Sequence, residues 1–573
     1  MNVPVCLPQD DADAAARRAQ LETSQTQYEY TWHRPEGVAT AVELPRGESF
    51  SPELIARFAL IKQRLAMRNA KTGAAEDIAT ASQTWTATPA ADSSVDVATR
   101  FFDSLRAPSL AHETRRGTPA VCVTFFDGEH PPLLQRYLDE PTLHDRLHAW
   151  QRVGGANPLM LRRARVVPEA FAVTSEHFAR AMGDRDSLDA ARAEGRLYIG
   201  DWSCLDETRS GAVEGTPKHL YAPWALYVES REGALLPAAI QCGARPGAPV
   251  YTPADGARWR AAKLAVQCAD TQMQGLHFHL GRCHFLMEAF ALATKRHLAD
   301  RHPVKALLLP AMQFTLPINR SVRDELMVPG ARLDTLMAPT FQHSLALVAR
   351  AVKDFDLAAA LPPADIAARD VGELAQYPWR DDALDVWQAL RGFVAAYLGL
   401  YYADDAAVRG DGEVAAWARE MASPWGGRLR VPTPHDRATL ADLVAYILFV
   451  AGPQHTVINY AQYDNMAFAP HMPMALYAPL PEGDDDDALE RMYMPEAIAR
   501  AQYGFFYEQS QLQENTLGRY AQGTFIDPRV DAVVHAFQRE LADVEARINA
   551  RNAQRLVAYP WLLPSVIRAS IHS

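Results

Sequence analysis

The sequence predicts a predominantly α-helical fold with minor β-sheets. A proline-free stretch from Asp270 to about Asp300 carries apolar residues on all sides, which is typical of a helix buried in a large helical body. We expect His302-Pro303 to end this helix, because the residue before a proline is biased away from helical angles. The apolar run at 440–452 is too short to cross a bilayer and predicts a second buried helix.

The remaining segments predict one amphipathic helix, a few strands and loops. Residues 52–69 repeat apolar side chains with a helical period, whereas residues 1–75 show no alternating series of strands. Residues 76–98, rich in Ala, Ser, Thr and Asp, predict an irregular connection. Strand character occurs at 119–126 and in the segments RLYIGDW and APWALYVES, which indicate a minor sheet. The acidic run at 482–487 lacks EF-hand spacing, so we expect a solvated loop there.

Charge and cysteine usage narrow the class of protein. The net charge of −12 and the absence of a basic cluster argue against a nucleic-acid partner, which needs clustered Lys and Arg. The N-terminus has neither a basic start nor an apolar core of signal-peptide length, so we expect a cytoplasmic protein, with export left open. Six widely spaced cysteines form no CxxC pair and predict reduced thiols: Cys6, Cys122, Cys204, Cys242, Cys268 and Cys283.

Two pairs of metal-ligand residue types stand out by their spacing. His279 and His284 are five apart, so on a regular α-helix they diverge by about 140° and share no metal unless a π-type widening brings them onto one face. His277 is a competitor, because His277 and His284 differ by only about 20° on a regular helix. His455 and Asn459 are four apart and need no distortion. Spacing alone leaves His277 and His279 both open.

These residues lie in a series of motifs that resembles the lipoxygenases, non-haem iron dioxygenases of polyunsaturated fatty acids. From GGANPLMLRR near residue 154 onward, the resemblance covers roughly three quarters of the chain. The motifs stand in the family's order: HLGRCH, EAFALATKRHLADRHP, LLLP, INRSVRDEL, YPWRDDAL, YYADD, PQHTVINYAQYD, TLGRY and AYPWLLPSVIRASIHS.

The resemblance implies one large helical catalytic domain at 99–573, preceded by a helical extension and irregular connection at 1–98. Length alone would favour two or more domains. Many lipoxygenases add an N-terminal β-barrel for membrane docking, and we expect it to be absent here, as in compact bacterial members. A peripheral membrane contact through residues 52–69 is the alternative to a helix that packs on the catalytic body.

The family's ligand set implies one iron per chain, with manganese as the alternative metal. The registration of Glu288 and the ATKRH segment selects His279 over His277, and Glu288 is a candidate acceptor for a ligand imidazole. The chain ends in Ser573 where the family usually ends in isoleucine, so either the Ser573 α-carboxylate or the imidazole of His572 would complete the site. The implied ligands are His279, His284, His455, Asn459 and Ser573.

The implied reaction inserts O2 into a cis,cis-1,4-pentadiene of a linoleate- or arachidonate-type fatty acid and gives a conjugated hydroperoxide. A hydroxide held by the metal, not a side chain, would be the base. Leu326 and Leu517 match the leucines that clamp the pentadiene, Val322 matches the position that influences oxygen attack, and Thr271 matches the pocket base. We expect a monomer. A hydroperoxide isomerase and an inert lipid-binding protein are the alternatives; a zinc hydrolase lacks its HExxH or GxSxG motif.

Overall fold

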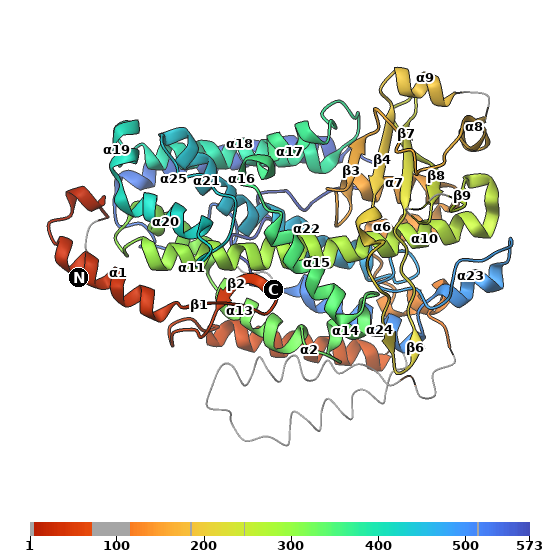
Figure 1. Cartoon of the computed structure of the whole chain (residues 1–573), viewed down its shortest axis with the longest axis horizontal. Coiled ribbons are helices and arrows are strands. Elements are labelled where there is room, and N and C mark those ends of the chain that lie inside the picture. Colours follow the sequence, from red (N-terminus) through yellow and green to blue (C-terminus); the bar gives the residue numbers. More distant parts are fainter. Residues whose placement is uncertain are drawn as a thin grey trace.

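One long helix, built from three consecutive segments, runs through the middle of the molecule (Figure 1). This computed structural model describes residues 5–71, 110, 115–183, 186–243, 245, 247–512 and 515–572. The segments are α10 (Gly256–Gln272), a π-helical segment (Met273–Phe285) and α11 (Leu286–His297). The predicted π-type widening is confirmed. The helix ends at His297, however, and Pro303 opens the next helix, α12 (Pro303–Leu308), where its missing N–H does no harm.

A second long helix crosses the first and is also buried. It consists of α21 (Arg437–Phe449), a π-helical segment (Val450–Gln454) and α22 (His455–Met466). The widening was not expected here; it coincides with Pro453, which removes one helical hydrogen bond and crowds the preceding turn. The predicted run at 440–452 is thus part of a 30-residue helix, Arg437–Met466, that is long and apolar enough to cross a membrane, but 89% of its most apolar window is buried inside the protein.

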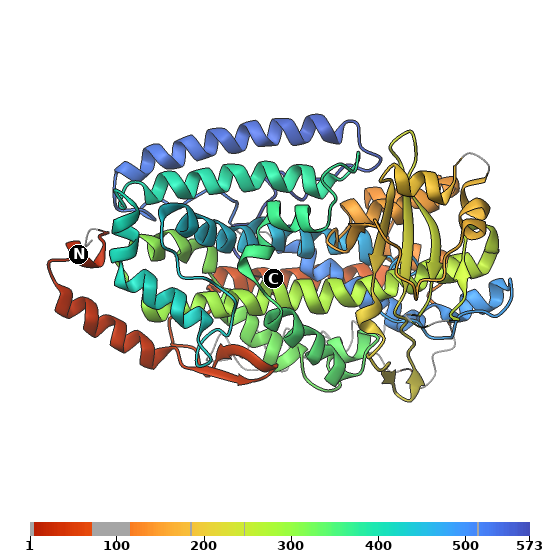
Figure 2. The same ribbon diagram turned by 45° about the horizontal axis from the view of Figure 1, so that its top comes forward.

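A five-stranded antiparallel sheet lies at one end of the helical body (Figures 1 and 2). One sheet face packs on the main core, and the other is covered by α8 (Ser175–Met182) and α9 (Leu188–Ala193). The segments RLYIGDW and APWALYVES supply β4 and β7, as predicted. The strand order is β3 (Leu161–Arg163), β4 (Leu197–Asp201), β7 (Trp224–Glu229), β8 (Leu235–Gln241) and β9 (Val250–Tyr251).

The strand predicted at 119–126 is wrong. This segment forms the short helix α5 (Pro119–Cys122) and a 3-10 turn (Val123–Phe126). Pro119 occupies the first helical turn, where proline is favoured. Phe125 and Phe126 are buried against the ring of Tyr503. The apolar run therefore reflects burial of a compact turn and not pairing in a sheet.

The N-terminal region contributes two helices and a hairpin, which pack on the helical body. The predicted amphipathic helix is α2 (Pro52–Lys71), whose apolar side packs against α24 (Glu496–Gln511). An unpredicted hairpin of β1 (Tyr30–His33) and β2 (Glu36–Ala41) follows α1 (Ala14–Gln27). The connection predicted at 76–98 and the boundary at 98/99 lie outside the described residues.

The other helices surround these elements. Figure 2 shows α25 (Arg529–Asn552) beside α18 (Pro378–Leu398) along one edge.

The acidic run at 482–487 is a loop that ends in the first turn of α23 (Asp486–Met492). All six cysteines are free, as predicted. Further elements are α6 (Pro132–Asp139), α7 (His144–Gly154), β5 (Ala212–Val213), β6 (Thr216–Pro217), α13 (Thr315–Ser321) with the π-helical Val322–Leu326, α14 (Arg332–Leu336), α15 (Phe341–Lys353), α16 (Leu357–Ala360), α17 (Pro362–Ala368), α19 (Asp405–Gly410) and α20 (Gly412–Ala422).

Candidate metal centre

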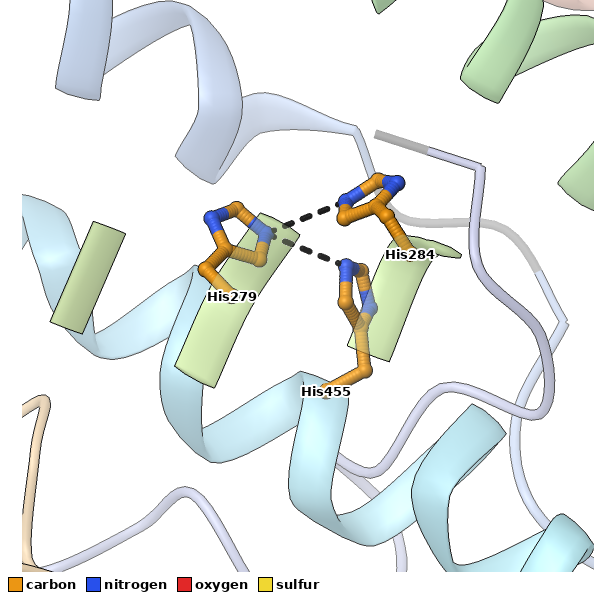
Figure 3. A group of neighbouring side chains, drawn as sticks. All are labelled: His279, His284 and His455. Carbon is orange, nitrogen blue, oxygen red and sulfur yellow. Dashed lines mark hydrogen bonds between the residues drawn. The ribbon is translucent and has the colours of Figure 1, made fainter. Parts of the chain in front are cut away.

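Three buried histidine rings converge where the two long helices cross. Figure 3 shows His279, His284 and His455 pointing toward one another. The Nε2 atom of His279 lies 3.2 Å from Nε2 of His284 and 3.4 Å from Nε2 of His455. We call these residues the three-histidine group. Among the described residues, it is the one set of His, Cys, Asp and Glu side chains whose ligand atoms gather closely enough for a metal.

The π-helical segment explains how two histidines five apart reach one point. Hydrogen bonds in a π-helix join residues five apart, so His279 and His284 lie on the same face. His455 is the first residue of α22 and comes from the crossing helix. His277 lies outside the group: its ring contacts Phe278, and burial lowers its pKa to about 3. The structure therefore brings together the predicted His279 and not its competitor.

The spacing of the nitrogens fits a metal ion. Histidine nitrogens bind first-row metals at about 2.1 Å, which places two ligands of one metal about 3.0–3.4 Å apart at angles between 90° and the tetrahedral value. The measured separations of 3.2 and 3.4 Å fall in this range. Burial lowers the pKa of His279 well below its usual value, and the neighbouring His284 adds to this effect, so the ring is neutral, as ligation requires. The donor set is neutral nitrogen without thiolate.

Asn319 of α13 contacts the ring of His284 on the side away from the group. Its Oδ1 lies 2.8 Å from Nδ1 of His284, and its Nδ2 donates to the backbone carbonyl of His284 at 2.7 Å. Glu288, predicted as the acceptor for a ligand imidazole, instead accepts from Asn319 Nδ2 at 3.1 Å. Burial raises the pKa of Glu288, and the Arg323 guanidinium opposes this only in part. Glu288 thus supports the ring through Asn319.

Gln462 lies against the other ring nitrogen of His279. Its Nε2 is 3.3 Å from Nδ1 of His279 and donates to Gln274 Oε1 at 3.1 Å. A metal held through Nε2 of His279 requires the reverse orientation of this amide, with Oε1 accepting from Nδ1–H. Sequence reasoning missed Gln462 although it is seven residues after His455, a spacing that returns to the same helix face. Asn319 lies in the INRSVRDEL motif, but its spacing from the histidines did not indicate a contact with them.

The other proposed ligands differ in how the structure places them. Asn459 is buried one turn after His455, and its Nδ2 donates to the Gln509 carbonyl at 3.5 Å. Ser573 lies outside the described residues. The imidazole of His572 is not part of the three-histidine group, since its Nδ1 contacts the Ser570 carbonyl at 3.0 Å and its Nε2 faces the Tyr460 hydroxyl at 3.4 Å.

A cavity opens directly beside the metal centre. Counted together with the part open to solvent, the empty space here is about 530 Å³. The structure brings Val322 and Leu326 to its wall, whereas Leu517 and Thr271 are buried elsewhere, and the Thr271 hydroxyl donates to the Gln267 carbonyl. Most of the lining residues have apolar side chains: Leu280, Ile318, Val322, Leu326, Leu333, Met337, Met466, Met474, Phe505 and Phe506. Gln274, Gln462 and Gln509 are the lining residues that carry side-chain amides.

The crossing helices, the three-histidine group and the adjoining apolar cavity define a helical protein whose candidate metal centre adjoins an apolar cavity. The chain belongs to the lipoxygenase family, whose sequence model matches residues 141–558. The linoleate 9/13-lipoxygenase of Pseudomonas aeruginosa is 35% identical over 455 residues, which cover 74% of this chain and 66% of that protein. The human hydroperoxide isomerase ALOXE3 is 30% identical over 454 residues, covering 77% of this chain and 64% of that protein.

Solved structures show the same fold. A lipoxygenase in complex with arachidonate matches with a TM-score of 0.84 at 24% identity, covering 100% of this chain and 84% of that one. The part of the chain that the structure describes therefore has the lipoxygenase fold, while the sequence alignments span slightly less than two thirds of the two curated relatives named above.

Proposed function

We propose that this protein is a non-haem iron dioxygenase that inserts O2 into a cis,cis-1,4-pentadiene of a polyunsaturated fatty acid and yields a conjugated hydroperoxide. The observation that carries this proposal is that His279 and His284 form part of the wall of a mostly apolar cavity. One cavity thus adjoins both the three-histidine group and apolar surfaces suited to an acyl chain. Family membership, and the lipoxygenase named for linoleate among the relatives, support the same reading.

The three-histidine group, Asn459 and the Ser573 carboxylate would hold the iron. Neutral nitrogen and hard oxygen donors suit a redox-active iron better than a structural zinc, and manganese is the alternative. Bound there, the metal would supply one-electron oxidation and lower the pKa of its own water, so that no side-chain base is needed. The chain's own task near the metal is to keep the imidazoles neutral and oriented.

The cavity wall would hold and orient the acyl chain. Val322 and Leu326 belong to one π-helical segment and line the cavity. His279 and His284, from the long central helix, line the same cavity. Apolar walls exclude water and fix the reacting carbon near the metal, and positioning of this kind accounts for much of the rate in such reactions. We propose linoleate- or arachidonate-type substrates, O2 as co-substrate and a monomeric enzyme.

A hydroperoxide isomerase is the second candidate, favoured by the identity to such an enzyme among the relatives. The two activities differ in product: a dioxygenase consumes O2 and forms a hydroperoxide, whereas an isomerase converts an added hydroperoxide to an epoxy-alcohol without O2. An inert lipid-binding protein would catalyse neither reaction, although it would still bind a fatty acid in the cavity.

The test is to load the purified chain with iron, add linoleate in aerated buffer and record ultraviolet absorbance together with O2 uptake. We expect conjugated diene to form in step with O2 consumption. The variant His284→Ala should abolish both signals. The matched variant His277→Ala removes a histidine from the same helix but outside the three-histidine group, and it should retain them. Full iron content without diene formation would reject the dioxygenase.

A further inference from the structure

Asn319 holds His284 at two places. The amide nitrogen donates to the backbone carbonyl of His284 at 2.7 Å, while the amide oxygen lies 2.8 Å from Nδ1 of its ring. Both residues are buried, with exposed fractions of 0% and 1%. A single side chain from α13 therefore fixes both the backbone and the imidazole of one member of the three-histidine group.

The surroundings determine which way the amide of Asn319 points. Its nitrogen faces two acceptors, the His284 carbonyl and the Glu288 carboxylate. The reverse orientation would put an oxygen against two oxygens and lose both hydrogen bonds. The amide oxygen is therefore the atom that faces the ring, and it can only accept. Consequently Nδ1 of His284 carries the proton, and Nε2 presents its lone pair to the other two histidines.

Glu288 in turn is held from the N-terminal hairpin. The backbone N–H of Ala41, the last residue of β2, donates to Glu288 Oε1 at 2.9 Å. Arg323 donates to the same carboxylate oxygen at 3.4 Å and to the Ala41 carbonyl at 3.4 Å. Glu288, Arg323 and Ala41 are all buried. The strand β2 thus supplies both a donor and an acceptor to the network that holds Asn319.

The β1–β2 hairpin also forms hydrogen bonds with the segment that lines the cavity. The guanidinium of Arg34, in the hairpin turn, donates to the carbonyls of Arg323 and Met327 at 3.3 and 3.1 Å. These carbonyls lie within and just after the π-helical segment that carries Val322 and Leu326. One N-terminal element therefore contacts both the metal-ligand network and the segment that lines the cavity.

We propose that Asn319 is a positioning residue that holds His284 in the metal-binding tautomer, and that docking of the β1–β2 hairpin through Ala41 and Glu288 is coupled to metal affinity. This inference rests on the proposed metal centre. Because coupling between two sites is reciprocal, a hairpin that strengthens metal binding must itself be held more tightly when the metal is bound. Partners of this kind behind metal-bound histidines typically change affinity by about 10–100-fold.

The first experiment measures Fe(II) affinity by anaerobic equilibrium dialysis. Asn319→Leu removes both hydrogen-bond contacts with His284 while keeping a side chain of similar size. We expect this variant to bind Fe(II) about 10–100-fold more weakly than the wild type does. Asn157→Leu is the matched control, since Asn157 is equally buried but donates to Asp270, away from the three-histidine group. It should match the loss of thermal stability of Asn319→Leu and keep wild-type affinity. Equal affinity in Asn319→Leu and the wild type overturns the proposal.

The second experiment needs no variant of the hairpin. Hydrogen exchange of the wild-type amides at 30–41 is followed with and without Fe(II), and we expect slower exchange with the metal. In Asn319→Leu saturated with Fe(II), the metal should have much less effect on these amides. Identical exchange with and without metal in the wild type overturns the coupling. A wild type that binds Fe(II) no better than His284→Ala instead rejects the proposed metal centre, and the inference falls with it.

Discussion

The backbone of Gly452 lies directly against the carbonyl oxygen of Arg568. A Cβ atom on Gly452 would lie 2.8 Å from that oxygen, closer than side chains normally approach. Gly452 belongs to the π-helical segment that leads into His455, and the Arg568 N–H donates to the hydroxyl of Thr456 at 2.9 Å. The C-terminal chain is thus packed onto the helix that carries His455, at the turn just before this residue.

We therefore expect Gly452→Ala to destabilise the protein. The added methyl group must displace backbone and not a flexible side chain, and such overpacking costs about 1–3 kcal/mol. Thermal unfolding of the metal-free chain measures this. Gly392→Ala is the control, because Gly392 lies in α18 with nothing within 4 Å of its Cβ position. That change should be neutral or stabilising by about 0.5–1 kcal/mol. Equal melting temperatures for Gly452→Ala and the wild type would refute the close packing.

Metal binding should raise the melting temperature. A ligand that binds the folded chain at about 100 times its dissociation constant stabilises it by about 2.7 kcal/mol. Fe(II) should give this stabilisation anaerobically in the wild type, and a chelator should reverse it. In His455→Ala the effect should be lost, whereas His535→Ala, at an exposed histidine of α25, should keep it. A shift that persists in His455→Ala would place the metal elsewhere.

Leu326 and Leu517 should respond differently to truncation. Both are buried, so Leu→Ala at either costs about 2–5 kcal/mol of stability. Only Leu326 lines the cavity. We expect Leu326→Ala to lower kcat/KM for linoleate by at least about tenfold, because the acyl chain loses a wall beside the metal centre. Leu517→Ala should keep kcat/KM within about twofold of the wild type. Comparable activity losses in the two variants would show that Leu517 also orients the substrate.

Acid should destabilise the protein partly through His471. Burial, and next the positive charges of His144, Lys263 and Arg152, lower the pKa of His471 to about 3. In the unfolded chain its pKa is about 6.5, so between these values the unfolded state binds more protons. The contribution of neutral, buried His471 to the free energy of unfolding is therefore complete above about pH 6.5. It is lost progressively as the pH falls toward 3. At pH 4 the loss is on the order of 3 kcal/mol.

His471→Phe keeps a ring beside Tyr137 but cannot be protonated. We expect its melting temperature to fall less than that of the wild type between pH 6.5 and pH 4. His435→Gln, at an exposed histidine, should leave the wild-type pH profile unchanged. Parallel profiles for His471→Phe and the wild type would mean that His471 is already protonated, or solvated, in the folded protein.

Local spacing predicted the parts of the site that depend on one helix at a time. The interval between His279 and His284 demanded a π-type widening, and the structure has it at Met273–Phe285. Length and lack of proline predicted the buried central helix, and the apolar period predicted α2. The strand predicted at 119–126 was wrong because an apolar run records burial and does not distinguish a strand from a compact turn.

The sequence by itself, through its periodicity and its resemblance to a family, determined the fold class and the histidines of the centre. The tertiary structure alone decided that His284 is held by Asn319, that Glu288 acts through it, and that the N–H of Ala41 closes the network. Ala41 and Glu288 are 247 positions apart in the chain. Spacing rules fix which residues share a helix face, but contacts between elements depend on how those helices and strands pack, which no local pattern contains.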